Sequence, residues 1–203
     1  MSDAGAKLIA AIEAQDVHAT ATLLAGGADP NSHDEYDRTA LGAATGKARW
    51  GDPARGLEIL RRLLTAGADP NRVGEHQTPP LIEAAYRGDD EVCRALVEGG
   101  ADVAARERGG DRHTALLAAA SGALPWLLEL CLEAGARVDD VSAQGHTVMH
   151  YAVSLPSYVE GKAARFEAVA ERLRSAGAAL EVVNGEWGAP LHWAAGSGNV
   201  RGV

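Results

Sequence analysis

The stretch "LLAGGADPN" at residues 23–31 is followed forty residues later by "LLTAGADPN" at residues 63–71. A leucine pair, a glycine and an Ala-Asp-Pro-Asn turn recur together in the same order. A phrase that returns at such a spacing predicts a chain built from internal structural repeats.

A glycine-alanine pair after an apolar run marks the repeat along the chain. The successive marker glycines are separated by 40, 33, 35 and 42 residues. The basic unit therefore has about 33 residues, and two units carry insertions. We place these insertions at 45–56 and 154–163, where proline and glycine indicate loops or irregular helix extensions. The marker glycines are Gly27, Gly67, Gly100, Gly135 and Gly177.

Each unit is expected to contain two helices. Thr39, Thr114 and Thr147 are suited to cap a first helix, and Pro80 and Pro190 suit a first helical turn, where a missing N–H costs nothing. A second apolar segment with helical spacing follows and ends at the marker glycine, which we expect in the left-handed conformation. The Asp-Pro-Asn type of sequence then turns the chain into an extended finger.

These features resemble the ankyrin repeat family. Its pattern is matched best by "PPLIEAAYRGDDEVCRALVEGGAD" at 79–102 and by "APLHWAAGSGN" at 189–199, and the resemblance covers about residues 6–203. It implies an all-α solenoid of stacked helix-turn-helix units with short fingers, forming a single ankyrin-repeat domain over 1–203. The expected units are 6–38, 39–78, 79–113, 114–146, 147–188 and a partial unit at 189–203.

The composition favours a protein partner over nucleic acid. Lysine and arginine number 19 against 28 aspartates and glutamates, which gives a net charge of −9. Phosphate binding draws on clustered positive charge, so nucleic acid is disfavoured, and a basic protein surface would suit this chain better. A second interpretation is that the acidity only aids solubility.

The beginning of the chain, its hydropathy and its cysteine usage favour a cytoplasmic protein. The beginning of the chain carries Asp3 and Glu13 and has no apolar run of signal-peptide length, and no stretch reaches the roughly 20 apolar residues of a membrane span. Cys93 and Cys131 have neither CxxC nor metal-ligand spacing, so we expect small buried side chains rather than a disulfide or zinc site. The abundance of alanine, glycine and arginine is typical of GC-rich genomes, bacterial ones among them.

We expect no catalytic residue, no cofactor and no metal. The segment "HTVMH" at 146–150 has the spacing of a zinc helix, but it lacks the activating glutamate and a third ligand. The family resemblance instead implies that His150 and His192 are structural hydrogen-bonding residues.

The function expected is a non-enzymatic scaffold for protein–protein interaction. In a stacked array, the fingers and the exposed positions of the first helices form a concave face, on which large side chains anchor a partner. A narrower version is an inhibitor or immunity-type protein that blocks a basic enzyme or toxin. The partner-binding candidates are Tyr36, Glu83, Tyr86, Tyr151, Trp187 and Trp193, and Trp50 and Tyr158 form a secondary loop surface. The competing interpretation for Tyr151 and Trp193 is packing against the neighbouring unit, and for Trp50 and Tyr158 it is packing onto the scaffold.

Two further functions stay open at this point. The sixth unit has almost no second helix, which fits a fragment of a longer protein, a short cap, or an end covered by a partner. The chain would then be the targeting portion of a longer enzyme, or a structural subunit that associates with itself through its open C-terminal end.

Overall fold

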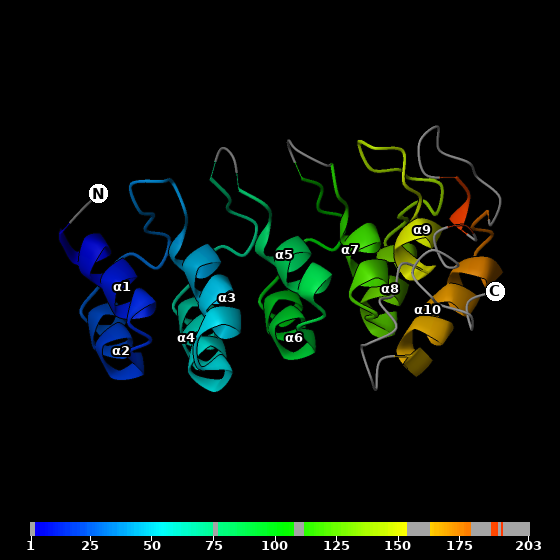
Figure 1. Cartoon of the computed structure of the whole chain (residues 1–203). Coiled ribbons are helices and arrows are strands. Elements are labelled where there is room, and N and C mark those ends of the chain that lie inside the picture. Colours follow the sequence, from blue (N-terminus) through cyan, green and yellow to red (C-terminus); the bar gives the residue numbers. More distant parts are fainter. Residues whose placement is uncertain are drawn as a thin grey trace. The chain divides into compact units, whose positions relative to one another are not determined.

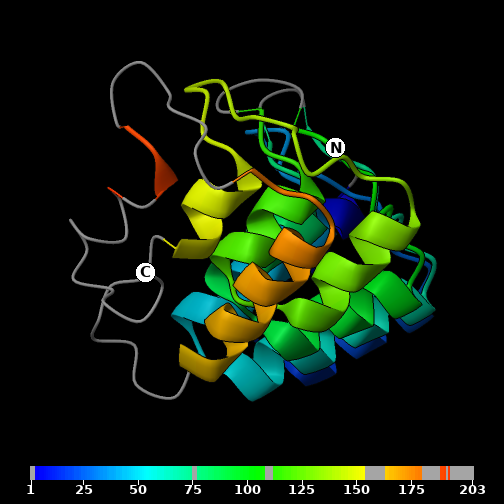
Figure 2. The ribbon, with the colours of Figure 1, turned by 90° about the vertical axis from the view of Figure 1, so that its right-hand side faces the viewer.

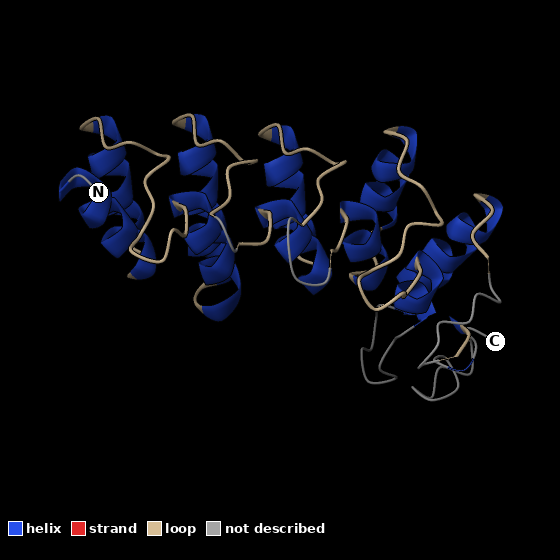
Figure 3. Ribbon diagram, turned by 90° about the horizontal axis from the view of Figure 1, so that it is seen from above, coloured by secondary structure: helices blue, strands red, loops and turns tan. Residues whose placement is uncertain are grey.

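The computed structural model describes residues 3–74, 77–107, 112–153, 163–179, 188–190 and 192. The chain divides into two compact units, and each is described by itself. The first contains Met1–Ala84 and Asp90–Asp102, and the second contains Ala85–Asp89 and Val103–Val203. In both units the described elements are helices, so the all-α fold is confirmed (Figure 3).

The first unit is built from helix pairs. Helix α1 (Asp3–Glu13) packs on α2 (Val17–Ala25), and α3 (Ala40–Trp50) packs on α4 (Pro53–Thr65). The two pairs contact each other through α1 with α3 and α2 with α4, and α4 also contacts α6 (Asp90–Glu98). Figure 1 shows the connections after α2 and α4 extending to one side of these helices as fingers.

The second unit repeats the arrangement. Helix α7 (Ala115–Ser121) packs on α8 (Pro125–Glu133), and α9 (Val148–Val153) packs on α10 (Ala163–Ser175) and on α7. Figure 2 shows α9 (yellow) beside α10 (orange) at the end of this unit. Helix α5 (Pro80–Arg87) begins in the first unit and ends in the second.

The marker glycines and two of the three predicted threonine caps are confirmed, whereas the Thr147 hydroxyl lies 2.9 Å from the Nδ1 of His150. All five marker glycines have positive φ angles, between 85° and 92°, which is the left-handed region that side chains with a Cβ resist. The hydroxyl of Thr39 accepts a hydrogen bond from the N–H of Gly42 at 3.1 Å, and that of Thr114 from the N–H of Leu117 at 3.2 Å. Each hydroxyl thus caps its helix.

The core is rich in alanine and poor in aromatic side chains. Ala115, Ala118, Ala119 and Ala120 of α7 are all fully buried, as are Ala84 and Ala85 of α5. Small side chains let helices approach closely, which is how a chain with 4% aromatic residues still excludes water. Cys93 and Cys131 are buried free thiols, as the sequence predicts.

The segment 45–56 is a helix extension rather than a loop. Helix α3 continues through Trp50, and the carboxylate of Asp52 caps α4 by accepting hydrogen bonds from the N–H groups of Ala54 and Arg55. The amide of Gln15 joins both ends of this connection, since it donates to the carbonyls of Lys47 and Asp52 and accepts from the N–H of Asp52. Most of the other predicted insertion, at 154–163, lies outside the described residues.

The recurring Asn of the Ala-Asp-Pro-Asn phrase joins one repeat to the next. The Asn31 side chain donates to the carbonyl of Gly67 at 3.1 Å and accepts from the N–H of Asp69 at 2.8 Å. Asn71 makes the same pair of bonds to Gly100 and Asp102, at 3.0 and 2.8 Å. The corresponding position after Asp102 is Ala104, which has no amide, so this asparagine ladder stops at Asp102, where the first unit ends.

Replacing Asn71 with alanine is expected to lower the free energy of unfolding by about 1–2 kcal/mol, because two backbone groups lose their partner. Asn71→Asp keeps the acceptor oxygen but loses the donor, so about half of the loss is expected. Chemical denaturation of both variants measures the effect. Equal stability of Asn71→Ala and the unmodified chain would show that the ladder contributes nothing.

Candidate functional site

An aromatic cluster gathers side chains from successive repeats of the second unit. It consists of Tyr86 from α5, His113 from the residues before α7, and Tyr151 from α9. The ring centroids of Tyr86 and His113 are 4.6 Å apart, those of His113 and Tyr151 5.8 Å, and those of Tyr86 and Tyr151 6.0 Å. The tilted and edge-on geometries are those that aromatic pairs prefer. All three side chains are half-buried, so part of each stays open to solvent.

Helix α7 has a small residue at the position that Tyr151 occupies in the next repeat. Ala118 follows Leu117 as Tyr151 follows His150, so Ala118 occupies in its repeat the position that Tyr151 occupies in the next. Ala118 is nevertheless fully buried. We attribute this to larger neighbouring side chains that close over a position where the repeat has only a methyl group.

A polar chain runs along the edge of the cluster. The Nε2 of His113 lies 3.1 Å from the hydroxyl of Tyr151, and its Nδ1 lies 3.6 Å from the carboxylate of Glu107. The same carboxylate accepts the backbone N–H of His113 at 3.3 Å. A proton on Nδ1 would face Glu107 and leave Nε2 to accept from Tyr151, which fixes both rings. The arrangement offers aromatic faces beside a carboxylate, and guanidinium and ammonium groups bind to such surroundings.

His150 lies behind this surface as a fully buried side chain. Its Nδ1 accepts the backbone N–H of Thr147 at 3.1 Å, and its Nε2 lies 3.1 Å from the carbonyl oxygen of Gly188. Burial lowers the pKa of the imidazole, and the hydrogen bond to Gly188 offsets part of that decrease. A neutral ring that donates from Nε2 satisfies both contacts, so His150 is a structural residue. The Nδ1 of His192 likewise accepts the backbone N–H of Ala189, at 3.3 Å.

The predicted site residues are distributed unevenly over the structure. Among the predicted residues that the structure describes, Tyr86 and Tyr151 are brought into ring contact. Tyr36 lies in the first finger with 75% of its surface exposed, and Trp50 lies at the end of α3 with 76% exposed. Glu83 is half-buried on α5. The remaining predicted residues, Tyr158, Trp187 and Trp193, lie outside the described residues.

The first unit contains an ion-pair network that the sequence did not predict. The carboxylate of Glu13 pairs with Arg38 at 2.6 Å and with Lys47 at 2.7 Å, and Arg38 also pairs with Asp34 at 3.0 Å. Burial raises the pKa of Glu13, but the hydrogen bond from Lys47 and the charges of Arg38 and Lys47 outweigh it and lower that pKa overall. No local pattern signals this network, because its members lie on α1, a finger and α3.

The histidines do not form a metal site in the described part of the chain. His146 and His150 have ring centroids 5.6 Å apart, so the two rings are neighbours. Across the described residues, however, no group of three or more His, Cys, Asp or Glu side chains has a metal-binding arrangement. The described helices also include none long and apolar enough to span a membrane.

Paired helices, fingers with the same turn, and a ladder between neighbouring repeats define a helical repeat protein. The chain belongs to the ankyrin repeat family. A family model described as ankyrin repeats in three copies matches residues 7–107, 48–139 and 81–161. Ankyrin repeats are a general protein–protein interaction domain.

Several curated proteins are similar to this chain. The E3 ubiquitin-protein ligase KEG of Arabidopsis thaliana is 33% identical over 139 residues, which cover 66% of this chain and 8% of the ligase. An ankyrin repeat domain-containing protein of Stachybotrys chartarum is 32% identical over 142 residues, covering 69% of this chain and 7% of that protein. A glycerophosphocholine phosphodiesterase of Schizosaccharomyces pombe is 32% identical over 95 residues, covering 47% of this chain and 8% of the enzyme. This chain thus spans less than a tenth of each of these relatives.

Proposed function

We propose that this chain is a non-catalytic module that binds a basic protein partner through its fingers and first helices. The observation that carries the proposal is the aromatic cluster, in which repeats present three half-buried rings, one of which, His113, lies beside the Glu107 carboxylate. Aromatic side chains bury much area at a low entropy cost, which makes them suitable anchors for a partner.

A basic side chain of the partner fits this site better than an acidic one. An arginine would stack on Tyr86 or Tyr151 and direct its donors to Glu107. The net charge of −9 would also attract a basic surface before contact. An inhibitor of a basic enzyme or toxin is one form of such a module, and cytoplasmic residence is part of the same proposal.

The test is selection of binders from a displayed peptide library, followed by comparison of two variants. Tyr86→Ala/Tyr151→Ala is expected to weaken binding of the selected peptides at least about 30-fold, as for other hot-spot pairs. His18→Ala, which removes an exposed ring of α2 outside the cluster, should leave binding unchanged. Circular dichroism confirms that both variants fold. If the selected peptides bind the double variant as tightly as the unmodified chain, the site is wrong.

The salt dependence of association gives a separate prediction. If the acidic surface steers a basic partner, the association rate should fall several-fold between low and physiological ionic strength, while dissociation changes less. Stopped-flow fluorescence with a selected peptide measures both rates. An association rate that is flat with salt would remove the acidic surface from the mechanism.

The lengths of the relatives favour a second candidate function. Two of them are named as enzymes, a ubiquitin ligase and a phosphodiesterase, and this chain matches only 8% of each. The chain would then serve as the targeting portion of a longer enzyme, which leaves its own role as a binding module unchanged. The self-associating subunit would depend on residues beyond 189 that are mostly outside the described ones.

A further inference from the structure

Helix α2 is an apolar helix that the fold covers incompletely. Its sequence, VHATATLLA, contains no acidic residue, lysine or arginine, yet only Thr20 among its residues is buried. Leu24 is half-buried and Ala25 is exposed. The neighbouring α4 buries five of its residues. An apolar helix left open in this way is a candidate for contact with a partner.

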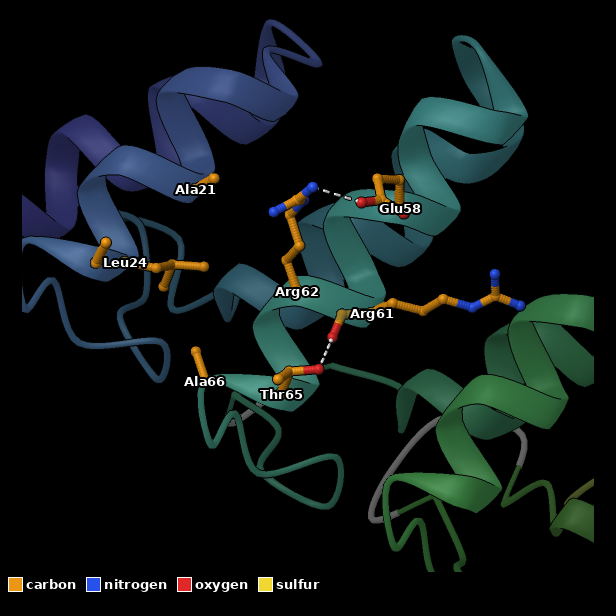
Figure 4. Close-up of a pocket in the computed structure, with 8 residues that line it drawn as sticks. Ala21, Leu24, Glu58, Arg61, Arg62, Thr65 and Ala66 are labelled. Carbon is orange, nitrogen blue, oxygen red and sulfur yellow. Dashed lines mark hydrogen bonds and ion pairs between the residues drawn. The ribbon is translucent and has the colours of Figure 1, made fainter.

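An open groove lies between α2 and α4 in the first unit (Figure 4). Its volume is about 490 Å³, and its apolar lining includes Ala21, Leu24, Ala25 and Ala66. The charged residues of the lining, all from α4, are Glu58, Arg61 and Arg62. Figure 4 shows Arg62 on the side of α4 that faces α2, whereas the Arg61 side chain extends away from α2 at the outer edge.

Positive charge concentrates on α4, in contrast to the acidic chain as a whole. This helix carries Arg55, Arg61 and Arg62 against a single acid, Glu58. Arg62 pairs with Glu58 at 2.7 Å, which engages one of its nitrogens and leaves other donors for a ligand. Arg61 makes no ion pair within the residues that the structure describes.

We propose that this groove binds an acidic amphipathic helix of a partner protein. Apolar side chains of that helix would lie on Leu24 and the alanines, and its carboxylates would pair with Arg62 and Arg61. Complementary charge favours this occupant, because the groove joins an apolar surface to two arginines, which outnumber the single carboxylate of Glu58 and keep donors to spare. The described lining contains no aromatic ring on which bases could stack, which argues against single-stranded nucleic acid.

This surface is independent of the aromatic cluster. It lies within the first unit and favours an acidic ligand, whereas the cluster lies within the second unit and favours a basic one. Failure of either proposal leaves the other standing, since the two use different residues and opposite charges.

A labelled synthetic helix tests the groove directly with the full chain. The probe has about 16 residues, with leucine at i, i+3, i+4 and i+7 and glutamate on the opposite face. Two comparison probes are the same peptide with lysine in place of glutamate and a single-stranded oligonucleotide. Fluorescence anisotropy is expected to show saturable binding of the acidic peptide, and no binding of the lysine peptide or the oligonucleotide.

Variants of the lining assign that binding to the groove. Arg62→Gln and Arg61→Gln should each weaken the acidic peptide by about fivefold or more, because each removes a charge-assisted contact. Ala25→Glu, at an exposed position of the lining, should abolish binding because it adds a negative charge that repels the acidic peptide. Arg55→Gln is the matched control, since Arg55 pairs with Asp52 at 3.3 Å and is not among the groove lining residues, and it should bind as the unmodified chain does.

Three results would overturn the proposal once circular dichroism shows the variants folded. They are absence of saturable binding by the acidic peptide, binding that survives Ala25→Glu, and an affinity of the Arg62→Gln variant for the acidic peptide equal to that of the unmodified chain. Oligonucleotide binding that depends on Arg61 and Arg62 would instead assign the groove to nucleic acid, and would equally contradict an acidic helix.

Discussion

Replacing Gly122 with alanine is expected to destabilise the second unit by about 3 kcal/mol or more. Gly122 ends α7, where a Cβ would lie 1.8 Å from the carbonyl oxygen of Ala85 and 3.0 Å from the Cα of Gly88. These neighbours are backbone atoms, so relief requires α7 to move relative to the end of α5. That shift would also displace Tyr86, and binding through the aromatic cluster should weaken in parallel.

Gly46 provides a matched control for this prediction. It lies within α3, and a Cβ there would meet no atom within 4 Å. Gly46→Ala should therefore be neutral or stabilise by about 0.5–1 kcal/mol, since alanine favours a helix interior. Thermal unfolding measures both variants, with a decrease of at least about 10 °C expected for Gly122→Ala. Similar melting temperatures for the two variants would refute the steric argument.

Replacing His150 with alanine is expected to cost about 3 kcal/mol, because a fully buried ring and two hydrogen bonds are lost together. The N–H of Thr147 and the carbonyl of Gly188 lose their partner inside the protein. His192→Ala is the comparison, since His192 makes a similar contact to a backbone N–H but is exposed, and its loss should cost much less. Denaturant unfolding of both variants gives the difference, and equal losses would contradict a special role for His150.

The same residue gives the stability of the second unit a pH dependence of known sign. The folded-state pKa of His150 lies below the ordinary 6.5 because burial disfavours the charged ring. The unfolded chain therefore takes up this proton first as the pH falls. The contribution of His150 is complete above about pH 6.5 and is lost as the pH falls through the folded-state pKa. Hydrogen exchange of 112–153 at several pH values should show this loss in the unmodified chain and a smaller one in His150→Ala.

Part of the site could be predicted from the sequence, and part could not. Tyr86 and Tyr151 are named from their positions in the repeat, and the structure places them 6.0 Å apart. His113 and Glu107 were not predicted, although His113 stands directly before the threonine cap. The role of His113 depends on residues tens of positions away, such as Tyr151 at 3.1 Å, and local spacing carries no information about such pairs; Glu107 joins the cluster through His113.

The asparagine ladder shows the same limit. The phrase Ala-Asp-Pro-Asn predicts a turn, and the Asp29 and Asp69 carboxylates each accept the N–H two residues later at 2.9 Å, as such a turn requires. That the asparagine then binds the following repeat was not predicted, because the bond spans 29 to 38 residues. The first unit combines the aspartate turn with the asparagine bonds to the next repeat. The ladder ends where Ala104 stands in place of an asparagine.

The sequence by itself determined the repeat, the Thr39 and Thr114 caps and the left-handed glycines, because each depends on backbone preferences within a few residues. The tertiary structure decided which side chains meet: the aromatic cluster, the Glu13 network, and the groove between α2 and α4. These depend on how helices pack, and packing depends on the size of residues such as Ala118 together with neighbours far along the chain. Where a site is made of such contacts, its chemistry becomes visible only after the chain has folded.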